Sequence, residues 1–529
     1  MTTGRASPEE LLKDCNIQVS KLDDRTLLAS VDPENLPDVI DCLVSKLGLH
    51  FATCLGIDLT ALGDGRVELI YVLTMPEHAK ILLVKTALTR EACLKPCHVK
   101  VPATLWCELE TRDLVGVKLC DVPSGRFVLP DSAEEYPPLS KLHIYSERRI
   151  SAAKCLEVRH PEGFVELFPH HPYFYEHEDI LVKVSDNKVV DVYYRGFYNH
   201  RGIEKLGESR LRIDQLPFLA ERICGICGFT HSTAVCQAVE NALRIEVPDR
   251  ARFCRTLMLE LERVESHLLW LGLMCYALGR KDLFLKVMKV REKIMTICEI
   301  LVGNRKMYGL NTIGGVRELI TPESVMKVRS SYAQTRDEIL DVLKLIEDFP
   351  ELRQVQGVGV LSRDDAHRLG AVGPVARASG IPYDVRKALP YAAYREVSFS
   401  VPVMSEGDVY ARYMVRLQET RESLDIIEQV LFRDEIVSGP ARAEYTFEEG
   451  KLGVGITEAP RGENVHFVLT GRDMRAYRWK VRAPTYANLH VLPKILIGQD
   501  VKYANIIVLS LDPCLSCTDR LVLVKEVRR

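Results

Sequence analysis

The stretch from Pro248 to Gly279, PDRARFCRTLMLELERVESHLLWLGLMCYALG, has the pattern of one long amphipathic helix. Its apolar residues recur at intervals of three or four positions, which is the spacing of one helix face. They are Leu257, Leu261, Val264, Leu268 and Leu271. Three further segments have the same spacing, at 281–302, 321–348 and 408–433. Helices of this length bury their apolar faces only against one another, so the sequence predicts a helical bundle.

Short strands are predicted around the bundle. Residues 66–74 (RVELIYVLT) and 80–85 (KILLVK) are apolar and rich in β-branched residues, and 36–49 has helical spacing. A hairpin is expected at 179–194, and strands and turns are expected after Glu444. The predicted fold class is therefore α+β. A small α+β domain over residues 1–150 precedes a domain over residues 151–529 with a long-helix bundle and peripheral β hairpins.

The composition excludes several classes of protein. The chain has 529 residues, of which 47% are hydrophobic and 27% charged, and a net charge of -3. These values exclude a disordered or collagen-like chain and give no reason to expect nucleic acid as a partner. The longest apolar run, 268–278, is shorter than the roughly 20 residues that span a bilayer, and residues 1–14 lack the core of a signal peptide. A cytoplasmic chain is expected, in which disulfides are rare.

The 16 cysteines are the unusual feature of the composition. Most stand singly in apolar surroundings and are expected to be small buried hydrophobic residues. These are Cys15, Cys42, Cys54, Cys155, Cys236, Cys254, Cys275 and Cys298. Cys93, Cys97 and His98 could form a set of metal ligands, but no second half-site of matching spacing lies nearby in the sequence.

Two C-x-x-C pairs flank the predicted bundle, one in 221–232 (ERICGICGFTHS) and one in 512–520 (DPCLSCTDR). Their four thiolates could bind zinc, an iron-sulfur cluster or a nickel-containing centre, because soft ligands suit these metals. A structural zinc site usually keeps its two halves about 15 to 20 residues apart, whereas these pairs lie at opposite ends of one domain. Neighbouring titratable groups favour a redox or catalytic metal; a structural metal and a coincidence are the alternatives. The neighbours are Glu221, Arg222 and His231.

At these residues the chain resembles the large, catalytic subunit of NiFe hydrogenases. It is most similar to the membrane-associated energy-converting group, which includes the formate hydrogenlyase large subunit. R-x-C-G-x-C-x-x-x-H and D-P-C-x-x-C-T are the paired signatures of that family. Further motifs agree with it: HRGIEK (200–205), GGVR (314–317), RASG (377–380), DVR (384–386), EAPRGE (458–463) and RAPTY (482–486). The resemblance spans about residues 155–520 and is specific because many independent motifs occur together.

Residues 1 to about 150 are similar to the thirty-kilodalton subunit of respiratory complex I. The similarity lies in FATCLGID (51–58), WCELETRDLVGV (106–117) and PLSK (138–141). These matches are looser, since WCELE departs from the acidic-basic-acidic pattern of that family. Fusion of such a domain to the catalytic one is a property of the formate hydrogenlyase-like proteins.

The resemblance implies a Ni-Fe centre held by four thiolates. By motif position, Cys224 and Cys514 would be terminal nickel ligands, and Cys227 and Cys517 would bridge nickel to iron. The iron of the family also carries CO and cyanide. The implied reaction interconverts H2 with two protons and two electrons. A metal-bound thiolate can accept a proton beside a Lewis acid, and Cys514 is the candidate for that role.

Two further residues are assigned a catalytic role by motif position. Arg482 matches the family's arginine above the open metal position, where a permanently charged guanidinium suits an electrostatic role. Glu176, in HPYFYE (171–176), stands where the group has a glutamate that carries protons, with a solvated acid as the alternative. Glu204 is a second acid in a family motif, with a structural ion pair as its alternative. His231 is expected to form a hydrogen bond near the cysteines.

The resemblance also implies partners. No second cysteine cluster fits a relay, so no iron-sulfur cluster is expected in this chain, and electrons would leave through a hydrogenase small subunit with a 4Fe-4S cluster. Ferredoxin-like electron-transfer subunits, integral membrane subunits and maturation proteins are further implied partners. The expected location is peripheral, on the cytoplasmic side of the cell membrane.

Two alternative functions are kept. One is a quinone-site subunit like the forty-nine-kilodalton subunit of complex I, a relative that lacks the four metal cysteines. The other is a scaffold subunit with structural zinc. Metal analysis distinguishes these alternatives from a hydrogenase.

Overall fold

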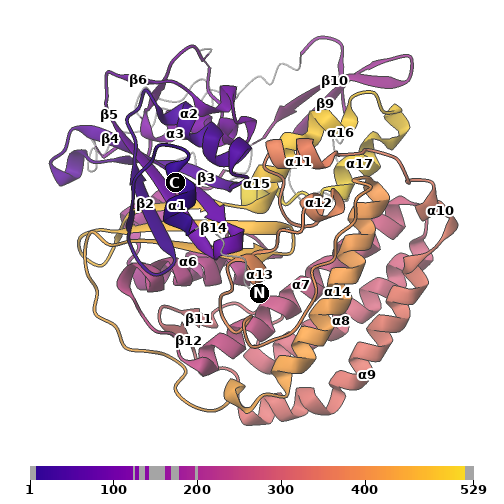
Figure 1. The fold of residues 1–529 in the computed structure, drawn as a ribbon. Helices are drawn as coiled ribbons and strands as arrows, with labels where there is room; N and C mark the ends of the chain where they lie inside the picture. Colours follow the sequence, from indigo (N-terminus) through magenta and orange to yellow (C-terminus); the bar gives the residue numbers. More distant parts are fainter. Residues whose placement is uncertain are drawn as a thin grey trace, which may run out of the picture. The chain divides into compact units, whose positions relative to one another are not determined.

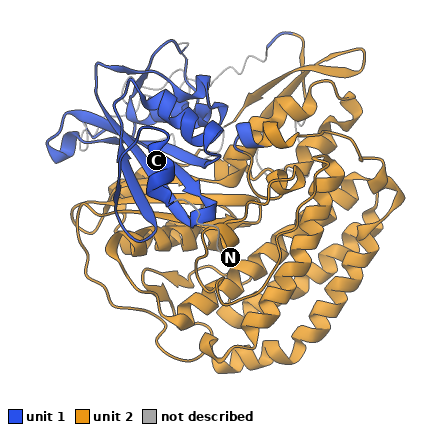
Figure 2. Cartoon of the chain, in the orientation of Figure 1, with its two compact units in different colours: residues 1–162, 367–370, 522–529 blue, residues 163–366, 371–521 orange. Residues whose placement is uncertain are grey.

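The computed structural model describes residues 7–122, 125–129, 137–141, 161–167, 178–196 and 200–518. The chain forms two compact units, one built mainly from residues 1–162 and the other mainly from 163–366 and 371–521 (Figure 2). Both units contain helices and strands, which confirms the predicted α+β class. The predicted domain boundary at residue 150 lies outside the described residues and stays a prediction.

The first unit is built on a five-stranded sheet. In sheet order the strands are β1 (Val19–Lys21), β2 (Thr26–Ser30), β5 (Lys80–Thr89), β4 (Arg66–Met75) and β3 (His50–Asp58). β4 and β5 are antiparallel and joined by a short turn at Pro76–His78, which confirms the predicted strand pair. The predicted helix at 36–49 is α2 (Leu36–Asp41), continued by a π-helical turn at Cys42–Lys46. α3 (Leu105–Val115) packs on β3, where Gly56 leaves room for Thr111.

Two disulfides in this unit show that the expectation of free thiols was wrong for some cysteines. Cys15 bonds to Cys42, and Cys93 bonds to Cys120, with Cα atoms 5.7 and 5.3 Å apart. The parallel pairing of β6 (Cys93–Leu94) with β7 (Lys118–Leu119) brings the second pair together. A pairing of segments 27 residues apart leaves no local pattern in the sequence, which is why it was missed.

The disulfide of Cys93 also removes the ligand set that included Cys97 and His98. Cys97 is buried, and its backbone N–H donates to Glu108 Oε1 at 2.9 Å. Other single cysteines are buried free thiols, as predicted. They are Cys54, Cys236, Cys254, Cys275 and Cys298. Cys155 lies outside the described residues.

The second unit contains the predicted bundle. Its long helices are α7 (Asp249–Ala277), α8 (Lys281–Val302), α9 (Pro322–Glu347) and α14 (Val409–Leu431), which lie side by side in Figure 1. Each agrees with a predicted helix to within two residues at either end. α9 begins with a capping box, in which Thr321 Oγ1 accepts from the N–H of Ser324. Most of α7 is buried on all sides, and its buried residues include charged ones.

Small sheets surround the bundle. β8 (Phe164–Glu166), β9 (Asp179–Ser185) and β10 (Lys188–Arg195) form one of them. The hairpin predicted at 179–194 is confirmed, with Asp186 and Asn187 both in the left-handed region at φ 50° and 61°.

A second small sheet packs on a helix that the sequence did not indicate. β13 (Leu452–Ala459), β14 (Gly462–Thr470) and β15 (Ala476–Arg482) contact α6 (Gly228–Leu243). A Cβ atom on Gly455 would lie 2.0 Å from the Ala234 carbonyl oxygen, so glycine permits this close approach.

The prediction of strands and turns after Glu444 is wrong beyond β15. The chain continues as short helices, namely α15 (Pro484–Asn488), α16 (Leu492–Leu496), α17 (Ala504–Ser510) and α18 (Leu515–Thr518). Helices of four to seven residues are too short to show a helical period in the sequence.

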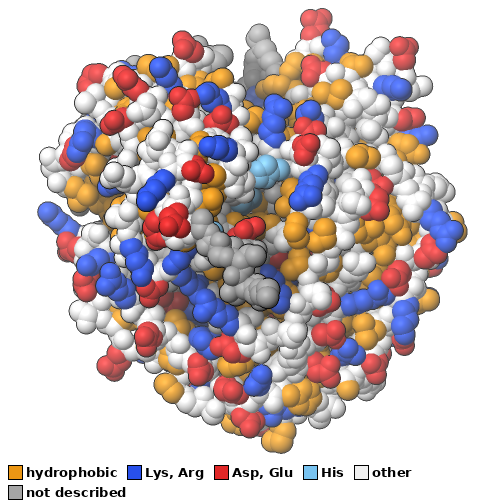
Figure 3. Space-filling model, viewed as in Figure 1, with side chains coloured by type: hydrophobic (Ala, Val, Ile, Leu, Met, Phe, Trp, Pro, Cys, Tyr) orange, Lys and Arg blue, Asp and Glu red, His pale blue; other side chains and the backbone are white. Residues whose placement is uncertain are grey.

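Shorter helices complete the described parts. They are α1 (Pro8–Lys13), α4 (Ile203–Arg210), α5 (Leu216–Ala220), α10 (Pro350–Arg353), α11 (Arg363–Arg368), α12 (Gly373–Ala378) and α13 (Val385–Ala388), with a two-stranded ribbon of β11 (Asn311–Thr312) and β12 (Gly315–Val316). Among the described residues, no helix combines the length and apolarity needed to cross a membrane. Basic and acidic side chains are interspersed over the face shown in Figure 3, in keeping with the small net charge.

Candidate metal centre

The four predicted ligands lie together in the second unit. Cys224 and Cys227 stand in the loop between α5 and α6, whereas Cys514 and Cys517 follow α17. Their Sγ atoms are all within 4.8 Å of one another, and all four residues are buried. The Sγ–Sγ distances are 3.2 Å for Cys224–Cys514, 3.4 Å for Cys227–Cys517 and 3.0 Å for Cys514–Cys517. The fold thus joins two segments separated by 290 positions.

This donor set fits a soft metal. Four sulfur atoms bound about 2.3 Å from one ion lie roughly 3.8 Å apart in a tetrahedron, so a small outward movement of these side chains would admit an ion. Ala483 is buried against the cysteines and Ile226 packs beside them, which limits access of water. Nowhere else in the described parts do three or more His, Cys, Asp or Glu side chains converge this closely.

The backbone favours a negative charge on one sulfur. The N–H groups of Ile226 and Cys227 point at Cys224 Sγ from 3.2 and 3.3 Å. Because the thiols of Cys227, Cys514 and Cys517 also donate to it, the pKa of Cys224 lies well below its ordinary value. The hydrogen bond to Cys224 raises the pKa of Cys227, and burial raises the pKa of Cys517. Cys224 is therefore the thiol whose negative charge the surroundings favour, and a bound metal ion would favour the ionised form of its ligands.

Arg201 connects the two cysteine loops. Its Nη1 donates to the carbonyl oxygen of Arg222 at 2.8 Å, and its Nη2 donates to those of Ile223 at 2.6 Å and Ser516 at 2.8 Å. The first two acceptors precede Cys224, and the third lies between Cys514 and Cys517. One guanidinium thus fixes the distance between the loops, a role that the sequence motif alone did not reveal.

Arg461 brings a buried positive charge to the cysteines. Its Nε and Nη2 donate to Asp512, at 3.0 Å to the carbonyl oxygen and 2.7 Å to Oδ1, and its Nη1 donates to Ser266 Oγ at 2.8 Å. Although burial lowers the pKa of Arg461, the charges of Asp512 and the nearby thiols raise it more. Arg461 also lowers the pKa of Cys224. It lies in the EAPRGE motif, whereas the arginine assigned to the site from the sequence lies in the RAPTY motif.

The predicted site arginine, Arg482, is buried at the end of β15. Its guanidinium donates to the carbonyl oxygen of Glu463 at 2.5 Å and forms an ion pair with the Glu463 carboxylate. The role predicted for Arg482 above the metal stays a prediction. Glu176 lies outside the described residues. Glu204 is buried in an ion pair with Arg478 at 2.9 Å, which agrees with the structural alternative.

A buried acid that was not predicted from the sequence lies beside the first cysteine pair. Glu262 of α7 accepts from the N–H groups of Phe229 at 2.7 Å and Thr230 at 3.0 Å, at the start of α6. Burial, together with the smaller effect of the Cys224 charge, raises the pKa of Glu262 to about 8. Its only signal in the sequence is that it is a charged residue within the helix predicted at 248–279. A carboxyl group that exchanges a proton near neutral pH therefore lies close to the cysteines.

The titratable neighbours of the first pair have separate partners. His231 Nδ1 lies 3.0 Å from His466 Nε2, and Trp479 Nε1 donates to His466 Nδ1 at 3.2 Å. This bond leaves His466 Nε2 as the donor to His231 when His466 is neutral. Glu221 accepts from the N–H of Gly309 at 2.9 Å, and burial raises its pKa to about 7.

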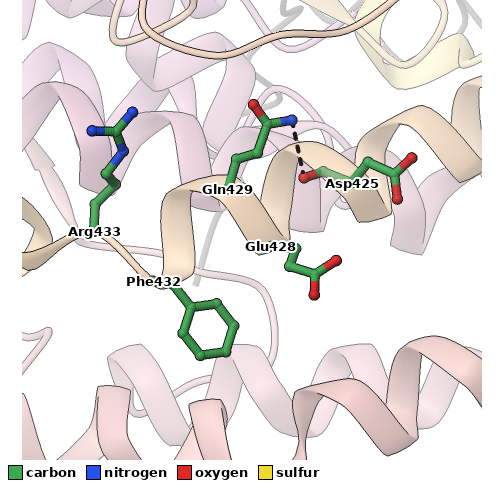
Figure 4. A pocket seen from close by; sticks show the side chains of 5 residues that line it. All are labelled: Asp425, Glu428, Gln429, Phe432 and Arg433. Carbon is green, nitrogen blue, oxygen red and sulfur yellow. Dashed lines mark hydrogen bonds between the residues drawn. The ribbon is translucent and has the colours of Figure 1, made fainter.

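A separate surface pocket lies on α14 (Figure 4). It is lined by Asp425, Glu428, Gln429, Phe432 and Arg433. Gln429 Nε2 donates to the carbonyl oxygen of Asp425 at 3.3 Å, one turn earlier in the helix. The lining contains no cysteine, so this pocket is distinct from the metal centre.

Three protein-family models match the chain. Residues 29–149 match "Respiratory-chain NADH dehydrogenase, 30 Kd subunit", and residues 201–278 match "Nickel-dependent hydrogenase". Residues 277–449 and 442–520 match "Respiratory-chain NADH dehydrogenase, 49 Kd subunit". The matches confirm both resemblances found in the sequence.

Individual relatives cover most of the chain. Formate hydrogenlyase subunit 5 of Escherichia coli (strain K12) is 36% identical over 519 residues, which are 95% of this chain and 90% of that protein. Hydrogenase-4 component G of the same organism is 36% identical and covers 93% of this chain and 88% of its own length. A chain from the structure of the membrane-bound sulfane sulfur reductase, an archaeal respiratory membrane complex, is 30% identical with a TM-score of 0.63. It covers 68% of this chain and 98% of its own length.

Proposed function

Because the chain belongs to the family of hydrogenase large subunits that includes formate hydrogenlyase subunit 5, we propose that it is the catalytic subunit of a NiFe hydrogenase. The reaction would be H2 ⇌ 2 H+ + 2 e-. The observation that carries this proposal is the buried cluster of four cysteines. Cys224 and Cys514 would hold nickel terminally, and Cys227 and Cys517 would bridge nickel to iron. When bound, the centre would supply the Lewis acid and the electron store that cleavage of H2 requires.

The surrounding residues would control charge and water around the cysteines. Arg461 places a fixed positive charge beside the thiolates, and Asp512 holds its guanidinium in a fork. A fixed charge of this kind stabilises the opposite charge that develops during a reaction, and solvent need not reorganise for it to do so. The electrostatic role inferred from sequence for Arg482 fits Arg461 at least as well. Arg482 would act with Glu463 to hold the strand that follows Arg461.

Protons would leave the site through acids nearby. Cys514 is proposed as the thiolate that accepts the first proton, and its N–H donates to Thr485 Oγ1 at 3.0 Å, which fixes its loop. Glu262 is a candidate proton acceptor, because its pKa of about 8 lies near neutral pH and its charge interacts with that of Cys224. Glu176 stays in the proposal as a later carrier on the basis of its motif alone.

The relatives support a place in a membrane complex. They include the membrane-bound hydrogenase subunit alpha of Pyrococcus furiosus and a chain of an archaeal respiratory membrane complex. We propose a peripheral position on the cytoplasmic side of the membrane, with integral membrane subunits as partners. Electrons would pass to a small subunit with a 4Fe-4S cluster and on to ferredoxin-like subunits, with no iron-sulfur cluster in this chain. Maturation proteins would insert the metals, including an iron that carries CO and cyanide.

Metal analysis of the chain purified with its partners tests the proposal. We expect nickel and iron in equal amounts in the wild-type chain, and H2-dependent reduction of a dye by the complex. The variant Cys514→Ser should lose nickel. Cys254→Ser is the matched control, because Cys254 is a buried free thiol that donates to the Ile436 carbonyl oxygen, and serine can keep that bond.

Two outcomes would support the alternatives. Zinc without nickel would indicate a scaffold subunit. Absence of any metal, with activity toward a quinone, would indicate a subunit like the 49 Kd relative, whose family model matches residues 277–449 and 442–520.

A further inference from the structure

A network of buried charges occupies the space between α7, α12, α14 and the hairpin of β13 and β14. Its members have fully buried side chains joined by ion pairs. They are the carboxyl groups of Glu260, Asp384, Glu419 and Glu458, the guanidinium groups of Arg263, Arg377 and Arg386, and the imidazole of His267. The function proposed above uses none of these residues.

The network is continuous from one end to the other. His267 Nε2 lies 2.9 Å from Glu419 Oε2, and Arg377 Nε donates to Glu419 Oε1 at 2.7 Å. Arg377 Nη1 donates to Glu458 Oε1 at 2.9 Å and lies 3.6 Å from Asp384 Oδ2. The chain of contacts thus runs from α7 to the end of β13.

Arg386 extends the network to its other end. It donates to both oxygens of Asp384, at 3.0 and 2.7 Å, and to both oxygens of Glu260, at 3.1 Å each. Arg263 Nε donates to Glu260 Oε2 at 3.4 Å, and its Nη2 donates to the carbonyl oxygen of Glu458 at 2.7 Å. Arg263 and Arg377 thus both contact Glu458, so the two branches of the network meet at this residue.

The charges do not balance when all four carboxyl groups are ionised. Four carboxylates face three guanidinium groups, and His267 is neutral because burial lowers its pKa to about 4. Its Nδ1 has no hydrogen-bond partner in the described parts, as expected for the bare nitrogen of a neutral ring. Arg461 and Arg416 lie nearby: Arg461 pairs with Asp512 and lowers the pKa of Cys224, whereas Arg416 lies 4.0 Å from Asp512 Oδ2 and also interacts with Glu419, at the opposite end of the network from Glu458. An unpaired negative charge in such surroundings is costly, so the network favours one bound proton.

Glu458 is the member least compensated by positive charge. Glu260 receives two guanidinium groups and the hydroxyl groups of Tyr394 and Ser423, at 2.5 and 2.6 Å. Asp384 has a forked pair with Arg386. Glu458 receives one guanidinium N–H, and its other oxygen accepts only the backbone N–H of Val385 at 3.0 Å.

Several charged groups face Glu458 from the elements packed around it. They are Arg377 of α12, Asp384 before α13, Arg263 of α7, and Glu463 opposite it on β14, which is itself paired with Arg482 and Tyr383. The phenol oxygen of Tyr391 accepts from the Glu458 N–H at 3.0 Å. Burial and, next in size, the charge of Asp384 raise the pKa of Glu458 to about 7.

We propose that this network stores one exchangeable proton, carried by the carboxyl group of Glu458. The step is the uptake of one proton by a carboxylate to give a carboxylic acid, and its return to a carboxylate. Glu458 is three residues from Arg461, which lies in the two-residue turn that joins β13 to β14. A change in its charge therefore acts on the hairpin that carries the site arginine. This inference about a proton near the metal centre rests on the proposed function only for its catalytic meaning.

Infrared difference spectroscopy of the full chain between pH 5.5 and pH 9 tests the stored proton. We expect C=O bands of protonated carboxyl groups that disappear as the pH rises, one of which is absent from Glu458→Gln while those of Glu221 and Glu262 remain. Glu240→Gln is the matched control, because Glu240 is also buried but is paired in a fork with Arg255 at 2.7 and 2.9 Å. This control should keep the band. If Glu458→Gln does not fold, Glu458→Asp should shift the band instead of removing it.

The outcomes separate this inference from the proposed function. The same set of titrating bands in Glu458→Gln as in the wild-type chain, or no titrating band in the wild-type chain, would overturn the stored proton even if nickel is bound. A band that depends on Glu458 in a chain without nickel would keep the proton store and reject the hydrogenase. In a nickel-loaded complex, Glu458→Gln should keep its nickel and lose one ionisation from the pH profile of H2 oxidation. An unchanged profile would show that the proton store is not coupled to the site.

Discussion

Replacement of Arg201 by alanine should loosen the metal centre without removing any ligand. Arg201 makes three hydrogen bonds to carbonyl oxygens, and only the one to Ser516, at 2.8 Å, crosses from the first cysteine loop to the second. A hydrogen bond from a charged donor contributes about 1.5–3 kcal/mol. Since about 1.4 kcal/mol corresponds to a factor of ten, holding the two loops together should become roughly 10- to 150-fold less favourable.

Competition with a chelator measures this effect. The chelator concentration that removes half of the nickel should fall by the same factor in Arg201→Ala, and amide hydrogens of residues 513–518 should exchange faster. Arg201→Lys should give a smaller change, because an ammonium group cannot reach three carbonyl oxygens in a fixed fork. Arg475→Ala is the matched control. Arg475 also joins distant segments, through a 3.1 Å bond to the Ser209 carbonyl oxygen, but it contacts neither cysteine loop in this bond.

Two results would refute the reasoning about Arg201. One is a nickel affinity and an exchange rate in Arg201→Ala equal to those of the wild type. The other is an equal loss of nickel in Arg475→Ala, which would show that general destabilisation is responsible.

Three further predictions concern single features. Arg461→Lys should keep its nickel but oxidise H2 roughly 10²–10³-fold more slowly in a dye-reduction assay, because the fork to Asp512 is lost; an unchanged rate would argue against the role of Arg461. The pKa of Glu262 is raised to about 8, so the folded state favours the protonated carboxyl group. The stability that this group contributes is complete below the ordinary pKa of glutamate and is lost as the pH rises to 8. Chemical denaturation should therefore show the unfolding free energy of the wild type falling by roughly 2–4 kcal/mol relative to Glu262→Gln between pH 5 and 8, and parallel curves would contradict this. Peptide mapping without reductant should find Cys15 linked to Cys42, and Cys15→Ser should lower the stability of the first unit by roughly 3–4 kcal/mol, given the 27-residue separation; a thiol at Cys15 in the native chain would disprove the link.

Long-range periodicity made the bundle predictable. The apolar spacing in 248–279 repeats over many turns, so the helical period of α7 can be recognised even where single residues depart from it. The hairpin at 179–194 was predictable because two left-handed residues, Asp186 and Asn187, must stand at its turn. α6 was not predicted, although it is a helix of 16 residues that is buried over most of its length.

The ligands were predictable, whereas their surroundings were not. Cysteine is a metal ligand by its residue type, so the two pairs could be proposed as ligands before their positions in the fold were known. Glu262 and Arg201 act through distances to backbone groups of other segments. Such contacts leave no pattern in a single sequence. The same limit explains the missed disulfides, whose partners are joined by strand pairing and by the ends of two helical segments.

The two arginines of the adjoining motifs show why geometry decides their roles. Ala459 pairs with Gly462 at the end of the hairpin, so Pro460 and Arg461 form its two-residue turn. A turn residue has no cross-strand neighbour, and the Arg461 side chain is free to extend beyond the sheet to Asp512 and Ser266. Arg482 instead stands in the ladder opposite Val465, where its side chain meets Glu463. Both residues adjoin an Ala-Pro pair in the sequence, and only the register of β13, β14 and β15 shows that Arg461 lies in a turn and Arg482 in a strand ladder.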